Sequence, residues 1–238
     1  MIRTLFGSGF SRESIIFLLL SLPVILFSLS LHETAHGYVA YKLGDRTAYN
    51  LGRLTLNPVK HLDPIGFLMM MLAGFGWAKP VPINTRNFKN PRVGMALTGA
   101  AGPLSNLLFA LLNAVFLRLS YEFLWLSFGG GRFTIYIRIL MLLFFIGISL
   151  NTTLAVFNLL PVPPLDGSRI FYVFLPAKLY FGIMKYERVI SIVLIFLLFF
   201  GVLSGMIFTL SDIFMRGMFY ITGLSLQDLN NIQLAIFS

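Results

Sequence analysis

Four long apolar segments decide what this chain can fold into. They cover residues 14–43, 92–120, 133–160 and 189–214. A transmembrane helix needs roughly 20 apolar residues to cross a hydrocarbon core of about 30 Å, and each segment is long enough. Only 11% of the residues are charged, against about a quarter in a soluble domain. We therefore predict an all-α polytopic membrane protein with about four transmembrane helices in contact with the lipid bilayer.

The segment 44–91, between the first two predicted spans, has a different character. Residues 49–56 and 78–84 alternate in polarity or contain prolines, which predicts short strands, the second of them at a sheet edge. The apolar stretch 65–75 is too short to span and is interpreted as re-entrant or interfacial. We expect a small membrane-associated β segment here, between the first and second transmembrane helices.

The basic residues predict an orientation in the membrane. Loops 42–92 and 161–188 share one side of a four-span topology and carry eight and four Lys or Arg residues, whereas the other side carries six. The positive-inside rule then places these loops in the cytosol of a cell membrane and both termini outside. The formal charge of +9 is explained by these flanking residues, so no nucleic-acid partner is expected. The first segment is interpreted as a retained helix, because no small-residue cleavage site ends it.

The first predicted span contains the sequence His32-Glu33-Thr34-Ala35-His36. Residues four apart lie on one face of a helix, so both imidazoles can reach one metal ion. Glu33 can hydrogen-bond a water on that metal and take its proton as hydroxide attacks a carbonyl. Ionisable groups inside a bilayer are costly unless they are paired or functional, which argues against an accidental pattern. The motif predicts a hydrolase that binds Zn²⁺ through His32 and His36 and uses Glu33 as its base.

Two histidines leave a catalytic zinc ion one protein ligand short. The chain has no cysteine, so the candidates are nine carboxylates and one further histidine. Asp166 is the best candidate, because three prolines end the third span just before it and Gly167 permits unusual backbone geometry. The alternative interpretation of Asp166 is a helix N-cap or a loop charge. His61 is a second candidate ligand but is better interpreted as an interfacial loop residue.

Polar residues also occur inside the third span, at Asn151, Thr152 and Thr153. They either line a water path to the metal or bond to neighbouring helices, and both interpretations stay open. The stretch 224–237 predicts a short amphipathic helix on the outer surface.

The two motifs together resemble the site-2 protease family of intramembrane metalloproteases. That family carries HExxH in one core helix and NxxPxxxLDG at the end of another, and the second pattern is matched from Asn158 to Gly167. Further likeness lies in residues 51–58, 76–82 and 101–106. The resemblance covers roughly residues 20–185 and is to the compact branch, without a PDZ or nucleotide-sensing domain.

This resemblance implies roles for individual residues. His32, His36 and Asp166 would bind one Zn²⁺, Glu33 would be the catalytic base, and Asn158 would lie near the substrate backbone. The substrate would be a single-span membrane protein, already cut outside the membrane by another protease. It would add to the edge of the predicted sheet as an extra strand, which exposes the scissile bond.

The same resemblance implies one membrane-embedded metalloprotease domain over residues 1–238. Its core would cover about 14–188, including the segment 44–91, and residues 189–238 would add a further span and a tail.

Two other classes of function compete with this one. Some zinc carriers also place His and Glu on a membrane helix, but transport needs a path open alternately to both sides, often within a repeated architecture. This sequence shows no internal repeat, and its Glu33 has a ready catalytic role. An inactive homologue that only binds membrane segments would not need the intact His, Glu and Asp set. The sequence therefore favours an intramembrane zinc metalloprotease.

Overall fold

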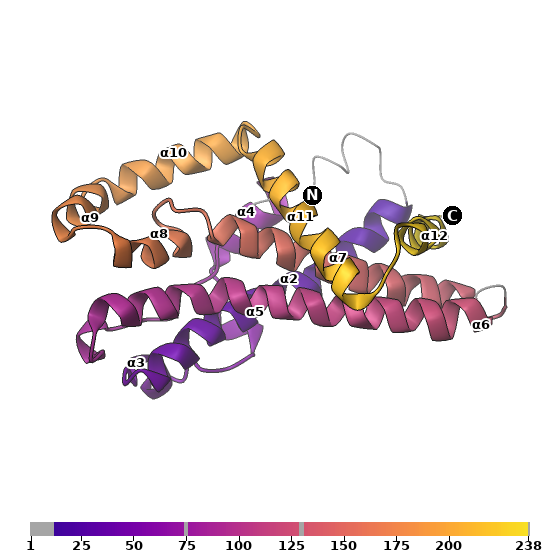
Figure 1. Cartoon of the computed structure of the whole chain (residues 1–238), viewed down its shortest axis with the longest axis horizontal. Coiled ribbons are helices and arrows are strands. Elements are labelled where there is room, and N and C mark those ends of the chain that lie inside the picture. The colour runs from indigo at the N-terminus through magenta and orange to yellow at the C-terminus, as the bar shows by residue number, and fades with distance from the viewer. Residues whose placement is uncertain (1–11, 74–75, 129–130, 238) are drawn as a thin grey trace.

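A computed structural model describes residues 12–73, 76–128 and 131–237. Its helices, in chain order, are α2 Arg12–Lys42, α3 Thr47–Asn50, η1 Pro58–Lys60, α4 Pro64–Ala73, η2 Thr85–Asn87, α5 Pro91–Leu119, η3 Ser120–Trp125, α6 Leu126–Phe128, α7 Thr134–Asn158, α8 Asp166–Phe171, η4 Tyr172–Phe174, α9 Ala177–Met184, α10 Glu187–Phe199, α11 Ser204–Thr222 and α12 Leu226–Phe237. The long helices α2, α5 and α7 lie side by side, and α11 crosses α7 (Figure 1).

The first three predicted spans are confirmed as helices. Three described helical stretches are long and apolar enough to cross a membrane: Ile15–Lys42, Pro91–Phe128 and Thr134–Asn158. The second stretch runs through α5, the π-helical η3 and α6 without a loop. The all-α architecture expected from the apolar segments is therefore present.

The fourth predicted span, over 189–214, is not one continuous helix, although its two halves together are long and apolar enough to cross a membrane. This region forms two helices, α10 and α11, which meet at a bend of 82°. Gly201 lies in the break with a φ of +73°, a left-handed conformation that favours glycine. The residues on both sides of the break are apolar, so hydrophobicity alone did not separate a bent pair from one straight helix.

The predicted β segment is also wrong. Among the described residues of 44–91 there is an isolated antiparallel bridge between Leu62 and Ala78, and no strand. Asparagine side chains explain part of this, because Asn57 and Asn84 accept hydrogen bonds from backbone N–H groups two residues ahead and start η1 and η2. Such local bonds give the backbone an alternative to pairing with a neighbouring strand.

Residues 79–84 form neither helix nor strand; they bond to side chains and a loop carbonyl, and the backbone of Asn84 is extended. One feature of the segment 44–91 follows the sequence pattern. The short apolar stretch forms α4, a helix of 10 residues that is too short to cross a bilayer.

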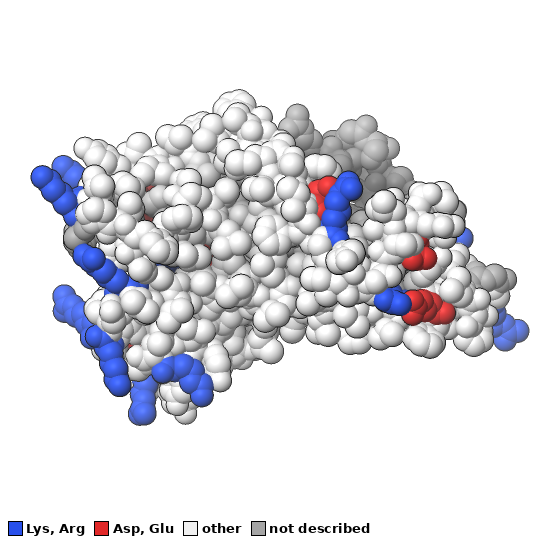
Figure 2. Space-filling view, in the orientation of Figure 1, with Lys and Arg blue, Asp and Glu red and all other residues white. Residues whose placement is uncertain are grey.

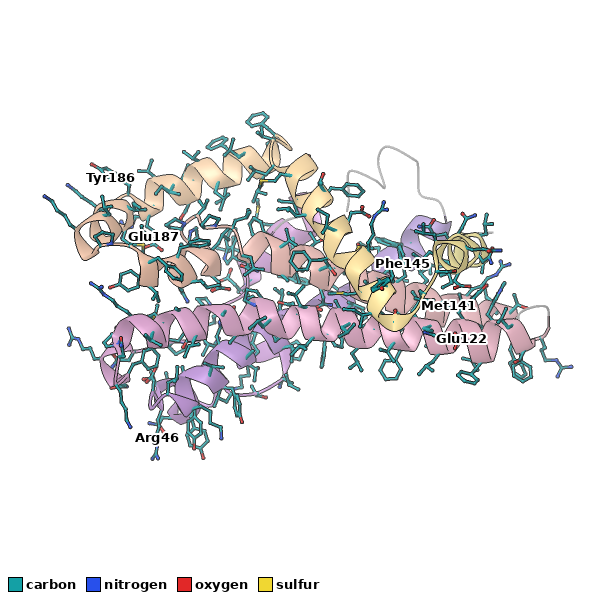
Figure 3. All side chains as sticks on the ribbon, in the orientation of Figure 1. Arg46, Glu122, Met141, Phe145, Tyr186 and Glu187 are labelled. Atoms are coloured by element: carbon teal, nitrogen blue, oxygen red, sulfur yellow. The ribbon has the colours of Figure 1, made fainter. Side chains whose placement is uncertain are left out.

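The main apolar core lies where α5, α7, α11 and α12 meet, and it includes Leu117, Met141 and Ile232. Met141 and Phe145 are labelled on α7 in Figure 3, beside α11. The helix predicted over 224–237 is confirmed as α12, which buries Ile232 in this core.

The two ends of the molecule differ in charge. In Figure 1, α3 and α9 lie at one end, whereas α6 and α12 lie at the other. Lys and Arg side chains gather at the end that carries α3 and α9. Toward the other end, acidic side chains lie next to basic ones (Figure 2). The labelled residues Arg46 and Tyr186 lie at the basic end and Glu122 lies toward the opposite one (Figure 3). Loops 42–92 and 161–188 thus share one end.

Candidate metal centre

The helix α2 brings the two motif histidines together. Residues 32 and 36 are one helical turn apart, and their Nε2 atoms lie 3.0 Å from each other. Both side chains are buried. The spacing of the sequence motif therefore produces the geometry expected from it.

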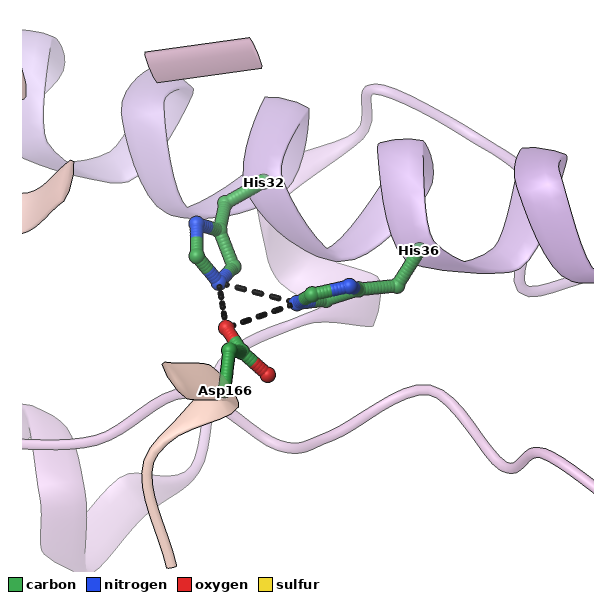
Figure 4. Close-up of side chains that lie close together, drawn as sticks. All are labelled: His32, His36 and Asp166. Carbon is green, nitrogen blue, oxygen red and sulfur yellow. Dashed lines mark hydrogen bonds and ion pairs between the residues drawn. The ribbon is translucent and has the colours of Figure 1, made fainter. Parts of the chain in front are cut away.

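Asp166 completes this cluster from a distant part of the chain (Figure 4). Its Oδ2 atom lies 3.0 Å from His32 Nε2 and 3.1 Å from His36 Nε2. Asp166 is the first residue of α8, whereas Leu165 occupies the N-cap position. The alternative interpretations as an N-cap or a loop charge are thereby excluded.

Gly167 allows this placement of Asp166. A Cβ atom at Gly167 would clash with the carbonyl oxygens of Leu159 and Leu160, at the end of α7. The start of α8 can therefore lie against the end of α7 only because this residue has no side chain.

Each imidazole is oriented by a second hydrogen bond. His32 Nδ1 lies 2.6 Å from Asn106 Oδ1, and His36 Nδ1 lies 2.6 Å from the carbonyl oxygen of Thr98. Oxygen acceptors place the proton on Nδ1 in both rings, which leaves the Nε2 lone pairs directed at the shared space. This is the tautomer in which histidine binds a metal, with the other ring nitrogen fixed by an outer partner.

Asn106 was not assigned a role from the sequence. Its Nδ2 group donates to Asn151 Oδ1 at 2.8 Å, so one amide links His32 on α2 to α7. An asparagine inside an apolar helix was the signal that could have identified it. The same bond decides between the two interpretations of Asn151 in favour of bonding between helices. Thr152 also bonds to protein, donating to the Ile148 carbonyl.

Space at the cluster is provided by Gly102 of α5. A Cβ atom there would clash with the Nε2 atoms of both His32 and His36. The three candidate ligand atoms are about as far apart as two ligands of a tetrahedral zinc ion, roughly 3.3 Å for zinc–ligand distances of about 2.0–2.1 Å. Two imidazole nitrogens and one carboxylate oxygen, all buried and close to one another, form a ligand set that fits zinc.

Glu33 lies beside this cluster, half-buried on α2. Its Oε2 atom accepts a hydrogen bond of 2.8 Å from the backbone N–H of Val81. Among the described residues, no donor is bonded to Oε1, so this oxygen is available to another partner.

The remaining predicted site residues bond to groups outside the cluster. The Asn158 side chain donates to the Leu154 carbonyl within its own helix, α7. His61 Nε2 lies 2.7 Å from the Thr55 carbonyl oxygen, in the loop before α4, as its interpretation as a loop residue expected. The structure therefore assembles His32, His36 and Asp166 and leaves these two side chains bonded elsewhere.

Comparison with known proteins places these residues in a family context. Residues 20–204 match the family described as Peptidase family M50. The chain is 49% identical over 146 residues to YwhC of Bacillus subtilis, covering 61% of this chain and 64% of that protein. It is 31% identical over 147 residues to Rip2 of Mycolicibacterium smegmatis, covering 60% of this chain and 52% of the relative. It is 32% identical over 152 residues to Rip2 of Mycobacterium tuberculosis, with the same shares.

All three relatives bear the name putative zinc metalloprotease. The matched region spans less than two thirds of the length of each of them. No solved structure matches the chain.

Proposed function

The chain belongs to Peptidase family M50, the site-2 protease family, and from this premise we propose that it is an intramembrane zinc metalloprotease. It would hydrolyse peptide bonds in or near transmembrane segments of membrane-anchored proteins. The observation that carries this proposal is the buried cluster of His32, His36 and Asp166, with Glu33 directly beside it on the same helix. Two histidines and a glutamate inside a membrane-spanning helix are costly unless they serve a function.

The three clustered residues would hold one Zn²⁺ through His32 Nε2, His36 Nε2 and Asp166 Oδ2. Zinc supplies Lewis acidity, which makes water a nucleophile near neutral pH and polarises a peptide carbonyl. The protein orients the ligands, because Asn106 and the Thr98 carbonyl fix both rings. The burial of all three residues strengthens each of these electrostatic contacts.

Glu33 would act as the general base. Its Oε2 atom is held by the Val81 N–H, so Oε1 can accept the proton of the attacking water and later pass it to the leaving amine. A carboxylate with one oxygen fixed loses less rotational freedom when it reacts, which favours a productive geometry.

Residues 79–84 favour a peptide substrate. They meet Glu33 at the Val81 N–H, and a substrate that has unwound would align beside them as an extended strand. A helical substrate hides its carbonyls in its own hydrogen bonds, so unwinding is required before cleavage. The proposed substrate is a single-span membrane protein that another protease has already cut outside the membrane, and Asn158 would contact its backbone.

The charge distribution supports a cytosolic active-site side. The predicted loops at the α3 and α9 end carry twelve of the basic residues, eight plus four, against six elsewhere. The positive-inside rule places that end in the cytosol of the cell membrane. The start of α2 and all of α12 lie toward the other end, which corresponds to both termini outside.

The experiment uses purified protein in detergent and a panel of tagged single-span substrates. Wild type is compared with Glu33→Gln and Asp166→Ala, and bound zinc is measured on each. Glu33→Gln is expected to keep zinc and lose cleavage, whereas Asp166→Ala is expected to lose both. Glu122→Gln is the matched control, because Glu122 pairs with Arg118 toward the opposite end of the molecule. Cleavage by Glu33→Gln at the wild-type rate would overturn the proposed mechanism.

A further inference from the structure

Asp45 is a buried carboxylate that the proposed hydrolysis does not use. It follows the end of α2 and is fully buried. Its Oδ1 atom accepts hydrogen bonds from the Thr47 backbone N–H, the Thr47 hydroxyl and the Asn87 amide, the last at 2.7 Å. Its Oδ2 atom accepts the Asn84 backbone N–H at 2.7 Å. Asp45 therefore joins the helix that carries the metal cluster to residues 84–87.

Three side chains hold residues 79–84. The Lys79 carbonyl accepts a hydrogen bond of 2.8 Å from Arg53 Nη2, the Val81 N–H donates to Glu33, and the Asn84 N–H donates to Asp45. The Lys79 N–H also donates to the His61 carbonyl at 2.8 Å, beside the isolated bridge between Leu62 and Ala78. Beyond Lys79, side chains therefore set the position of this segment.

The contact between Val81 and α2 is close. A Cβ atom at Gly37, one helical turn beyond Glu33, would lie 3.1 Å from Val81 Cγ1 and 2.6 Å from Leu54 Cδ2. The absence of a side chain at Gly37 lets Val81 lie against the helix at the depth where its N–H reaches Glu33. The hydrogen bond from the Val81 N–H to Glu33 therefore depends on the position of residues 79–84 against α2.

The chain between Val81 and Asn84 is short. Three residues span at most about 10 Å, which limits how far Asn84 can move while Val81 stays in place. A buried carboxylate that accepts four hydrogen bonds is a rigid attachment, because each donor would otherwise lose a charge-assisted bond.

We propose that Asp45 is a positioning residue for the base: by holding Asn84 and Asn87, it keeps the Val81 N–H on Glu33 Oε2. Asp45 itself touches neither the metal ligands nor Glu33. The proposal rests on the proposed protease function for its catalytic consequence, but the placement of residues 79–84 can be measured without activity.

Two variants separate positioning from general stability. Asn87→Ala removes a bond to Asp45 Oδ1 from η2, which directly follows residues 79–84. Thr47→Val removes a bond to the same oxygen from α3. Both variants delete one hydrogen bond to one atom, and both leave the metal cluster intact. Asp45→Asn is the direct variant, used if it folds.

The first measurement is amide hydrogen exchange in the full-length protein. Pro80 and Pro82 carry no N–H, so exchange in a peptide covering 78–84 reports chiefly on Lys79, Val81, Ile83 and Asn84. Asn87→Ala is expected to speed this exchange by about tenfold, the size of losing one hydrogen bond to a charged group, and Thr47→Val is not. Equal exchange in Asn87→Ala and wild type, or equal acceleration in both variants, would overturn the proposal.

The second measurement is cleavage, with bound zinc and thermal stability recorded for each variant. Asn87→Ala is expected to lower kcat by about tenfold with KM and zinc content near wild type, whereas Thr47→Val keeps kcat. A fall in kcat that follows thermal stability in both variants would show a merely structural role. If wild type cleaves nothing, the protease function fails, and the exchange comparison still decides whether Asp45 positions residues 79–84.

Discussion

Replacing Asn106 with alanine tests how far the metal cluster depends on a residue that does not belong to it. The change removes the acceptor 2.6 Å from His32 Nδ1 and the donor 2.8 Å from Asn151 Oδ1. Two buried polar atoms on different helices are then left without these partners. Each such atom costs about 1–3 kcal/mol, and the loss of an outer partner of a metal-binding histidine lowers metal affinity by about 10- to 100-fold.

Asn113→Ala is the matched control on the same helix. Asn113 is also a largely buried asparagine of α5, but its amide donates to the Phe109 carbonyl within that helix. Zinc affinity is measured on purified protein by competition with a chelator of known affinity, and thermal unfolding is followed in parallel. We expect Asn106→Ala to lose about 10- to 100-fold in zinc affinity and Asn113→Ala to stay near wild type. An unchanged affinity in Asn106→Ala, or an equal loss in both, would refute the assignment of Asn106 to the metal site.

Three further changes test other parts of the structure. Gly102→Ala should abolish zinc binding, measured as metal content after purification, because its Cβ would clash with both motif imidazoles; an equimolar zinc content would contradict the geometry. Burial raises the pKa of Asp45, but hydrogen bonds from Thr47, Asn84 and Asn87 outweigh it and hold the pKa below its ordinary value of 3.8. Because the folded pKa lies below the unfolded one, this carboxylate stabilises the protein fully above pH 3.8, and the contribution is lost as pH falls through the folded pKa. Thermal unfolding should therefore depend less on acid pH in Asp45→Asn than in wild type. Asn158→Ala should raise KM, because Asn158 is proposed to contact the substrate backbone. It should keep zinc, because the Asn158 amide bonds to its own helix and the metal cluster is complete without it. An unchanged KM would remove Asn158 from the substrate site.

The local parts of the site could be predicted from the sequence, because they follow from helix geometry. The spacing of His32 and His36 fixes their shared face, and it holds in any α-helix. The partnership with Asp166 is of another kind, since 130 residues separate it from His36. Its place after the third span made it a candidate, and the family resemblance predicted it as a ligand.

The structure departs from the sequence predictions where two conformations share one composition. Apolar residues on both sides of Gly201 suit a straight helix and a bent pair equally well. In the segment 44–91, polarity alternates as in a strand, but asparagine side chains bind their own backbone and begin short helices. Only contacts with the rest of the protein choose between such alternatives.

One feature of α5 could have been found in the sequence and was missed. Thr98, Gly102 and Asn106 are spaced by four residues, so they lie along one face of that helix. The Thr98 carbonyl meets His36 and the Asn106 amide meets His32, while Gly102 makes room for both rings between them. The order is reversed along the two helices, as antiparallel neighbours require. The acceptor at position 98 is a backbone carbonyl, so Gly102 and Asn106 are the two of these residues whose residue type matters to the histidine pair. A glycine and an asparagine four residues apart in an apolar helix are therefore the sequence signal for the outer partners of this candidate metal site.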